Sequence, residues 1–96
     1  IMSFKKTQEV QWTIKEGLRE LTHVLAHLNY EVAGNQIIVR DQGKRLMIDL
    51  VYEGERHLGS LNLPMTQVNY EFIGYTREEM DEFMEHLRMH EMRMGG

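Results

Sequence analysis

The stretch Arg45–Tyr52, which reads RLMIDLVY, alternates in side-chain character along its whole length and decides the fold class. Its leucine and isoleucine side chains point to one side of an extended chain, while Met47, Asp49 and Val51 point to the other. This period of two is typical of a strand that lies on a hydrophobic core with one face only. We therefore expect an antiparallel sheet with one covered and one open face.

Other extended segments surround this strand. Gly34-Asn35 and Glu53-Gly54-Glu55 predict turns between them. Pro64 has no backbone N–H to donate, so it belongs at a turn, a bulge or a sheet edge. These breaks leave four further strand segments, which are Tyr30–Val32, Gln36–Arg40, His57–Leu63 and Gln67–Ile73.

Two amphipathic helices flank the sheet-forming region. Thr13 with Glu16, and Thr76 with Glu79, have the spacing of a capping box, in which each side chain satisfies a backbone N–H at the helix start. Behind each box, apolar residues recur at spacings of three and four. The first stripe is Ile14, Leu18, Leu21, Leu25 and Leu28, and the second is Met80, Phe83, Met84 and Leu87, with Gly95 and Gly96 ending the helix.

The segment before the first helix has two interpretations. Phe4, Val10 and Trp12 share one parity, which favours a strand over Gln8–Trp12; alternatively the helix begins as early as Thr7. If this segment is a strand, residues 1–96 form a single α+β domain whose elements follow in the order β-α-β-β-β-β-α. We expect an antiparallel four- to five-stranded sheet with two helices on one face, the count depending on whether residues 30–40 form one strand or two.

Composition excludes several classes of function. The chain has 96 residues and a net charge of −4, from fifteen acidic against eleven basic side chains, which argues against nucleic acid as a partner. No apolar run approaches the roughly 20 residues that span a bilayer, so no membrane partner is expected. The absence of cysteine excludes thiolate sites and is compatible with the cytoplasm, where we place the protein. No phosphate loop or nucleophile motif suggests an enzyme, and no cofactor is expected.

The end of the chain is rich in methionine and histidine. Glu82, His86 and His90 follow one another at spacings of four, so on a helix they form a column that could chelate a divalent ion. Met89 adds a thioether, a ligand that suits Cu(I). Packing methionines and a solvated histidine face explain the same pattern, so these four residues are metal candidates only.

A second histidine pair, His23 and His27, lies on the first helix. At about 100° per residue, both lie nearly opposite the leucine stripe. If that stripe packs on the sheet, this pair faces water and meets His86 and His90 only across a subunit contact. We therefore interpret these histidines as surface residues rather than as part of a functional site.

Two surfaces remain as functional candidates. By parity, Met47, Val51, Ile38 and Ile73 form an apolar patch on the open sheet face, interrupted by polar residues such as Asp49. A cleft lined by Tyr70, Phe72, Met80 and Met84 could instead hold a small apolar ligand. We expect a non-enzymatic interaction or assembly module that forms a homodimer or binds another protein. The alternatives are an apolar-ligand binder and a Met/His transition-metal binder.

Overall fold

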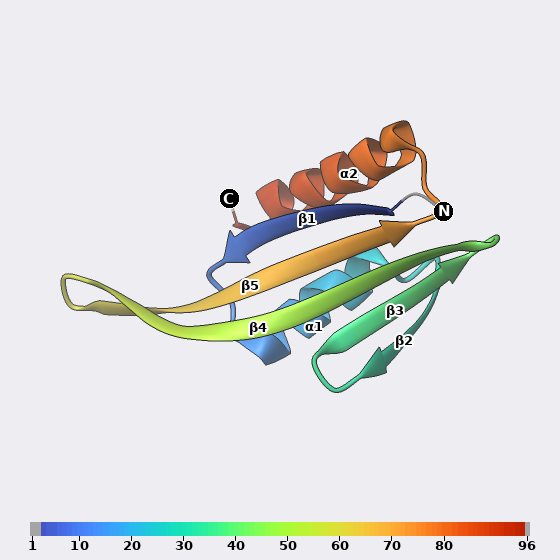
Figure 1. The fold of residues 1–96 in the computed structure, drawn as a ribbon. Coiled ribbons are helices and arrows are strands. Elements are labelled where there is room, and N and C mark those ends of the chain that lie inside the picture. The colour runs from blue at the N-terminus through green and yellow to red at the C-terminus, as the bar shows by residue number, and fades with distance from the viewer. Residues whose placement is uncertain (1–2, 96) are drawn as a thin grey trace.

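A computed structural model of the chain describes residues 3–95, with side chains described through Glu91. Figure 1 shows a single curved sheet with two helices, which confirms the α+β class and the predicted order. The elements in chain order are β1 (Ser3–Val10), α1 (Ile14–Val24), β2 (Asn29–Ala33), β3 (Gln36–Asp41), β4 (Lys44–Leu58), β5 (Leu61–Ile73) and α2 (Arg77–Gly95).

The five strands form one antiparallel sheet in the order β1-β5-β4-β3-β2. Strands β2 to β5 are joined by consecutive hairpins, while β1 lies at the far edge and pairs with β5 from Ser3↔Ile73 to Val10↔Thr66. The N-terminal segment is therefore a strand, and it begins earlier and ends earlier than the predicted Gln8–Trp12. Residues 30–40 form two strands around Gly34, which has the left-handed φ of +61° that the predicted turn requires.

Both helices cover the same face of the sheet, as predicted, and α2 lies beside α1 over the β1–β5 side (Figure 1). The core between helices and sheet contains the alternating residues of β4 and β5 together with the apolar stripes of both helices. Its largest fully buried side chains include Tyr70, Phe72, Leu21, Leu25, Ile37, Leu46, Ile48, Leu50, Met80 and Leu87.

Both capping boxes are present. The backbone N–H of Glu16 donates to Thr13 Oγ1 at 3.1 Å, and that of Thr13 donates to Glu16 Oε1 at 2.8 Å. Thr76 and Glu79 exchange the same two bonds at the start of α2. Hydrogen bonding to the cap holds the pKa of both glutamates below the ordinary value. Each helix therefore begins where the sequence predicts.

The end of α1 was predicted too late. The leucine stripe runs to Leu28, but the helix ends at Val24 and Leu25 is its C-cap. The backbone N–H of Leu28 donates to Leu25 O at 2.8 Å, which makes a tight turn. The chain must reverse here because β2 starts at Asn29, so the last two leucines of the stripe fill the core from a turn rather than from a helix.

The turn predicted at Glu53-Gly54-Glu55 is wrong, and so is the separate strand His57–Leu63. Strand β4 continues through this point, where the pairing register shifts between Tyr52 and Gly54 and Glu53 is left as the extra residue of a bulge. The chain reverses at Gly59-Ser60 instead, with Gly59 at a φ of +61°. Pro64, opposite Glu55, lies on the part of β5 beyond the end of β1, in agreement with the predicted edge position.

Gly17 determines how closely α1 approaches the sheet. A Cβ atom at this position would lie 2.6 Å from Leu50 Cδ2, well inside van der Waals contact. The buried positions of α1 are accordingly Gly17, Leu21 and Val24. The face of α1 that contacts the sheet is therefore centred on the Gly17 side of the predicted leucine stripe. This rotation of the helix about its axis sets the direction in which its polar residues point.

No helix in the described part of the chain is long and apolar enough to cross a membrane.

Candidate functional site

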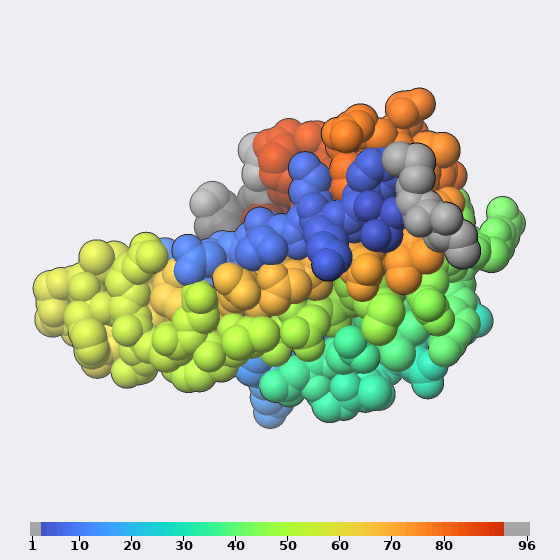
Figure 2. All heavy atoms as spheres, in the orientation of Figure 1, coloured from blue at the N-terminus to red at the C-terminus, as the bar shows by residue number. Residues whose placement is uncertain are grey.

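The most exposed part of the molecule is the outer half of the β4–β5 hairpin, residues 53–65, which we call the arm. Pairing of β3 with β4 ends at Gln36↔Asp49, and pairing of β1 with β5 ends at Val10↔Thr66. Beyond these points the arm is a two-stranded ribbon with no neighbouring strand on either edge. Figures 1 and 2 show it projecting from the body, and the longest dimension of the molecule is 47 Å.

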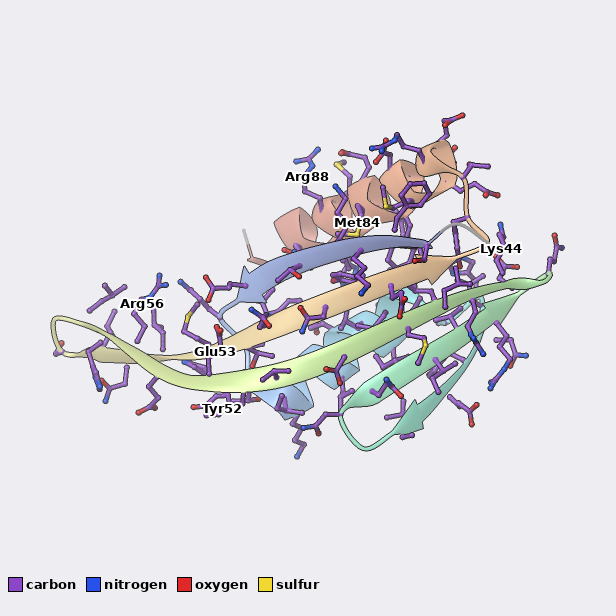
Figure 3. All side chains as sticks on the ribbon, in the orientation of Figure 1. Lys44, Tyr52, Glu53, Arg56, Met84 and Arg88 are labelled. Carbon is purple, nitrogen blue, oxygen red and sulfur yellow. The ribbon has the colours of Figure 1, made fainter. Side chains whose placement is uncertain are left out.

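The arm forms because two local features keep its strands in register. The bulge at Glu53 lets both strands continue past the body, and the pairs run from Gly54↔Met65 to Leu58↔Leu61. A two-residue loop with glycine in the left-handed region suits the twist of a hairpin. Figure 3 shows Tyr52 and Glu53 where the arm leaves the body and Arg56 further along it.

Large apolar side chains collect on this hairpin. Leu58 and Leu61, at the tip, are 52% and 60% exposed, and Val51 and Tyr52, at the base, are 45% and 48% exposed. These are four of the seven large apolar side chains that are strongly exposed in the described part of the chain; the others are Tyr30, Val32 and Met89. Exposed leucines opposite each other on a ribbon cost hydration free energy unless something covers them.

Alternation along β5 places the apolar residues of the arm on the side that is open in the body. Leu61 and Leu63 share the parity of Ile73, and Leu58 lies directly opposite Leu61. These three leucines therefore lie on the side of the sheet that the helices leave open in the body, although Met65, of the same parity, is buried. We call this side the open face.

The predicted interface residues all lie on the open face of the body. Met47 pairs with Ile38 across β3–β4, and Val51 lies further along β4; Ile73 lies at the end of β5. Val51 is strongly exposed, while the other three are partly covered by their neighbours. Asp49 separates Met47 from Val51, as the sequence predicted, so the apolar character of the open face is greater on the arm than on the body.

Charged side chains of both signs lie on the open face. Arg40 and Arg45 lie opposite each other at the end far from the arm, and Arg40 also pairs with Glu31. Asp49 lies in the middle of β4, and Glu9 lies near the arm. Two arginines therefore lie at one end of the open face and two carboxylates toward the arm, while Glu71 and Arg56 carry the opposite sign at those two ends.

Two carboxylates meet where the arm leaves the body. A side-chain hydrogen bond with Glu9, together with the repulsion between the two groups, raises the pKa of the Glu53 carboxyl. Both side chains lie at the solvent-exposed surface. The base of the arm therefore carries concentrated negative charge.

The residues of the predicted ligand cleft lie in the hydrophobic core. Tyr70, Phe72 and Met80 are almost completely buried, and Met84 packs against them from α2. The rings of Phe72 and Phe83 are in edge-to-face contact, with centroids 5.7 Å apart. The hydroxyl of Tyr70 donates to Gln8 Oε1, and burial raises the Tyr70 pKa far above its usual range. These side chains fill the space between α2 and the sheet with one another.

The histidine pairs meet within one chain, so the prediction that they could meet only across a subunit contact is wrong. The rings of His23 and His90 have centroids 5.5 Å apart, and those of His27 and His86 are 6.4 Å apart. The cause is the seating of α1 on Gly17, which turns the flank of the helix that bears His23 toward α2. We call this row of four rings between α1 and α2 the histidine seam.

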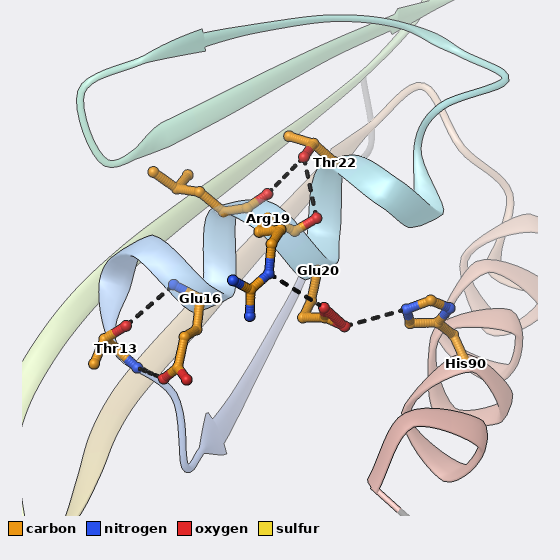
Figure 4. Close-up of polar contacts among 7 residues, drawn as sticks. Thr13, Glu16, Arg19, Glu20, Thr22 and His90 are labelled. Carbon is orange, nitrogen blue, oxygen red and sulfur yellow. Dashed lines mark hydrogen bonds and ion pairs between the residues drawn. The ribbon is translucent and has the colours of Figure 1, made fainter.

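The metal candidates on α2 have different neighbours and do not converge on one point. His86, with Glu82, lines a cavity of about 410 Å³ that also contains His27. His90 lies one turn further along and approaches Glu20 of α1, its Nε2 atom 3.6 Å from Glu20 Oε2 (Figure 4). Met89 is exposed and its sulfur contacts Arg88 instead. Within the described residues no group of three or more His, Asp or Glu side chains is already arranged to hold a metal ion.

Comparisons of the chain with models of protein families, with curated proteins and with solved structures give no significant match.

Proposed function

We propose that this chain is a non-enzymatic interaction module that self-associates through the arm and the adjoining open face. The observation that carries the proposal is a set of three exposed apolar side chains on the open face of one projecting hairpin, Val51, Leu58 and Leu61. Large apolar side chains left exposed on one face of a small domain are typical of a protein interface.

The energetics of a lone hairpin support this proposal. A two-stranded ribbon without a third strand is at best marginally stable in water. The arm has unpaired backbone edges on both sides, and the Leu58–Leu61 pair at its tip is more than half exposed. A partner that covers the leucines would remove apolar surface from water, at about 25 cal/mol per Å², and would give the ribbon a second layer.

The charge pattern favours a second copy of the chain as the partner. Most soluble oligomers are closed two-fold dimers, in which the same surface contributes from both subunits. A two-fold axis in the plane of the sheet and perpendicular to the strands reverses the strand direction. With the axis midway between these groups, it places Arg45 of one open face over Asp49 and Glu9 of the other. Complementary charge in this arrangement favours the dimer over random apolar aggregation.

Sedimentation equilibrium over a range of protein concentrations tests the proposal. Wild-type protein is expected to dimerise, and Val51→Asp and Leu58→Asp are expected to shift the mass to that of the monomer, because each buries a carboxylate in the contact. Met89→Asp is the matched control: it changes an equally exposed apolar residue on α2, away from the open face, and should leave the dimer intact. Circular dichroism verifies that all three variants keep the fold. Wild-type protein that stays monomeric, or variants that keep the wild-type mass, would contradict the proposal.

A further inference from the structure

The histidine seam contains a group of side chains that the self-association surface does not use. At one end of the seam, Glu20 and His23 of α1 and His90 of α2 come together from opposite sides. Glu20 and His23 are three residues apart, so they project from one flank of α1, one turn apart. Glutamate and histidine at this spacing on one helix, facing a histidine on another, is an arrangement from which helical proteins build metal sites.

The Nε2 atom of His90 is buried and has no hydrogen-bond partner. Its nearest charged neighbour is the carboxylate of Glu20, at 3.6 Å, which is too long for a hydrogen bond. The His90 and Glu20 side chains are only 17% and 12% exposed, so bulk water does not fully solvate either group. The unpartnered imidazole nitrogen and the poorly solvated carboxylate place two electron donors side by side, and a cation between them would be held by both.

We propose that Glu20, His23 and His90 form a binding site for a single divalent transition-metal ion such as Zn²⁺. The separations in the structure are close to those that coordination requires. Two imidazoles that share Zn²⁺ at a Zn–N distance of about 2.0–2.1 Å have ring centroids roughly 5–6 Å apart, and two donor atoms on a tetrahedral ion lie roughly 3.3–3.5 Å apart. The observed values are 5.5 Å for the two rings and 3.6 Å for the nitrogen and the carboxylate oxygen.

Binding requires only a local adjustment. The three side chains are not yet arranged as a metal-holding group, as no such group exists among the described residues. His23 is exposed, so its ring can rotate about χ1 and χ2 without disturbing the core. Because His90 and Glu20 are held between the helices, His23 is the ligand that moves when the ion binds.

The donor set selects the class of ion. Two imidazole nitrogens and one carboxylate oxygen suit Zn²⁺, Co²⁺, Ni²⁺ or Cu²⁺ and leave one position for water. Mg²⁺ and Ca²⁺ prefer all-oxygen sites, and Cu(I) prefers thioethers. Met89 contacts Arg88 rather than the seam, so the structure does not favour the Cu(I) site that the sequence suggested.

The surrounding charges favour a cation at this end of the seam. Glu91 lies close enough for its charge to interact with His90. Arg19 is the opposing cation, with its Nε atom 3.7 Å from Glu20. At the other end of the seam, the cavity beside His27 and His86 contains Lys44, whose ammonium pairs with Glu79 at 2.9 Å and disfavours a second cation there.

The difference between the two ends gives a matched experiment. Tag-free protein treated with a chelator is titrated with ZnCl₂ by isothermal calorimetry, and with CoCl₂ by visible absorption, which reports tetrahedral coordination. We expect one ion per chain, with affinity falling about tenfold or more in His90→Ala, His23→Ala and Glu20→Gln. His27→Ala and His86→Ala, at the other end of the seam, should bind within about twofold of wild type, since they leave all three ligands in place.

Two results would overturn the proposal. The first is the absence of saturable Zn²⁺ binding in wild-type protein that keeps its circular dichroism spectrum. The second is binding that falls as much in His27→Ala or His86→Ala as in His90→Ala. Because His90→Ala removes a largely buried ring, the folding of this variant is verified by thermal melting. His90→Gln, which keeps most of the bulk of the side chain but lacks the imidazole, provides a second variant with the same expected loss.

Discussion

The inner and outer halves of the β4–β5 hairpin are formed by the same two strands, but the helices cover only the inner half. In the body, the inward residues of both strands, such as Leu46 and Phe72, are completely buried under the helices. Past Tyr52 the same strands continue as the arm, where Leu58 and Leu61 are largely exposed. The two strands pair with each other in both halves, apart from the bulge at Glu53, but only in the body do they also pair with β1 and β3. The arm therefore lacks both the burial under the helices and the outer strand pairing that stabilise the body.

The largest expected effect contrasts a leucine from each half. Leu46→Ala should destabilise the protein by about 2–5 kcal/mol, because it leaves a cavity in a packed core. Leu58→Ala should change the free energy of unfolding of the monomer by no more than about 0.5 kcal/mol, because the side chain is more than half exposed. Urea unfolding at low protein concentration measures both. Similar losses in the two variants would contradict the contrast between body and arm.

A smaller effect tests the border between the halves. Thr66 is completely buried where β1 ends, and its hydroxyl donates to the backbone carbonyl of Trp12 at 2.6 Å. Thr66→Val leaves that carbonyl without its donor and should cost about 1–3 kcal/mol.

Thr7→Val is the matched control for Thr66→Val. The Thr7 hydroxyl donates to Asn69 at the surface, where water can replace the bond, so its loss should be within about 0.5 kcal/mol. Thermal unfolding of both variants compares them. Equal destabilisation would mean that burial of the Thr66 hydrogen bond adds nothing to its contribution to stability.

The smallest effect concerns the carboxylates at the base of the arm. The hydrogen bond to Glu9 raises the Glu53 pKa above its ordinary value, so the folded state holds the proton more tightly than the unfolded state. This contribution is present below the ordinary carboxyl pKa and is lost as the pH rises through the raised value. Glu53→Gln should therefore lose less stability than wild type as the pH rises from about 4 to 7. Glu55→Gln, with the same charge change on the arm, should keep the wild-type slope of melting temperature against pH, and an unchanged slope in Glu53→Gln would contradict this account.

Local signals predicted much of the fold. Capping boxes located both helix starts because they depend on residues three apart, and the alternation of Arg45–Tyr52 identified the two faces of the sheet. The sequence did not predict the arm, because a glycine between two charged residues, as in Glu53-Gly54-Glu55, is typical of a turn. Whether a glycine makes a turn or a bulge depends on the strand opposite it. The Gly59-Ser60 pair was the signal that could have located the true turn.

The histidine seam was missed for a different reason. Its rings meet because α1 is seated on Gly17, and a helical stripe defined by leucines does not reveal that a glycine makes the closest contact. The orientation of a helix about its axis depends on the surface beneath it, here Leu50. A spacing of four within each pair was visible in the sequence, but the distance between His23 and His90 depends on how two helices lie on one sheet.

Amide hydrogen exchange at two protein concentrations tests most directly whether the arm is an interface. We expect the amides of residues 53–65 to exchange rapidly in dilute protein, where the arm is a lone ribbon, and to be protected in concentrated protein, where a second copy covers it. The amides of β4 and β5 within the body should exchange at the same rate at both concentrations. Arm amides that exchange equally fast at both concentrations would contradict the account.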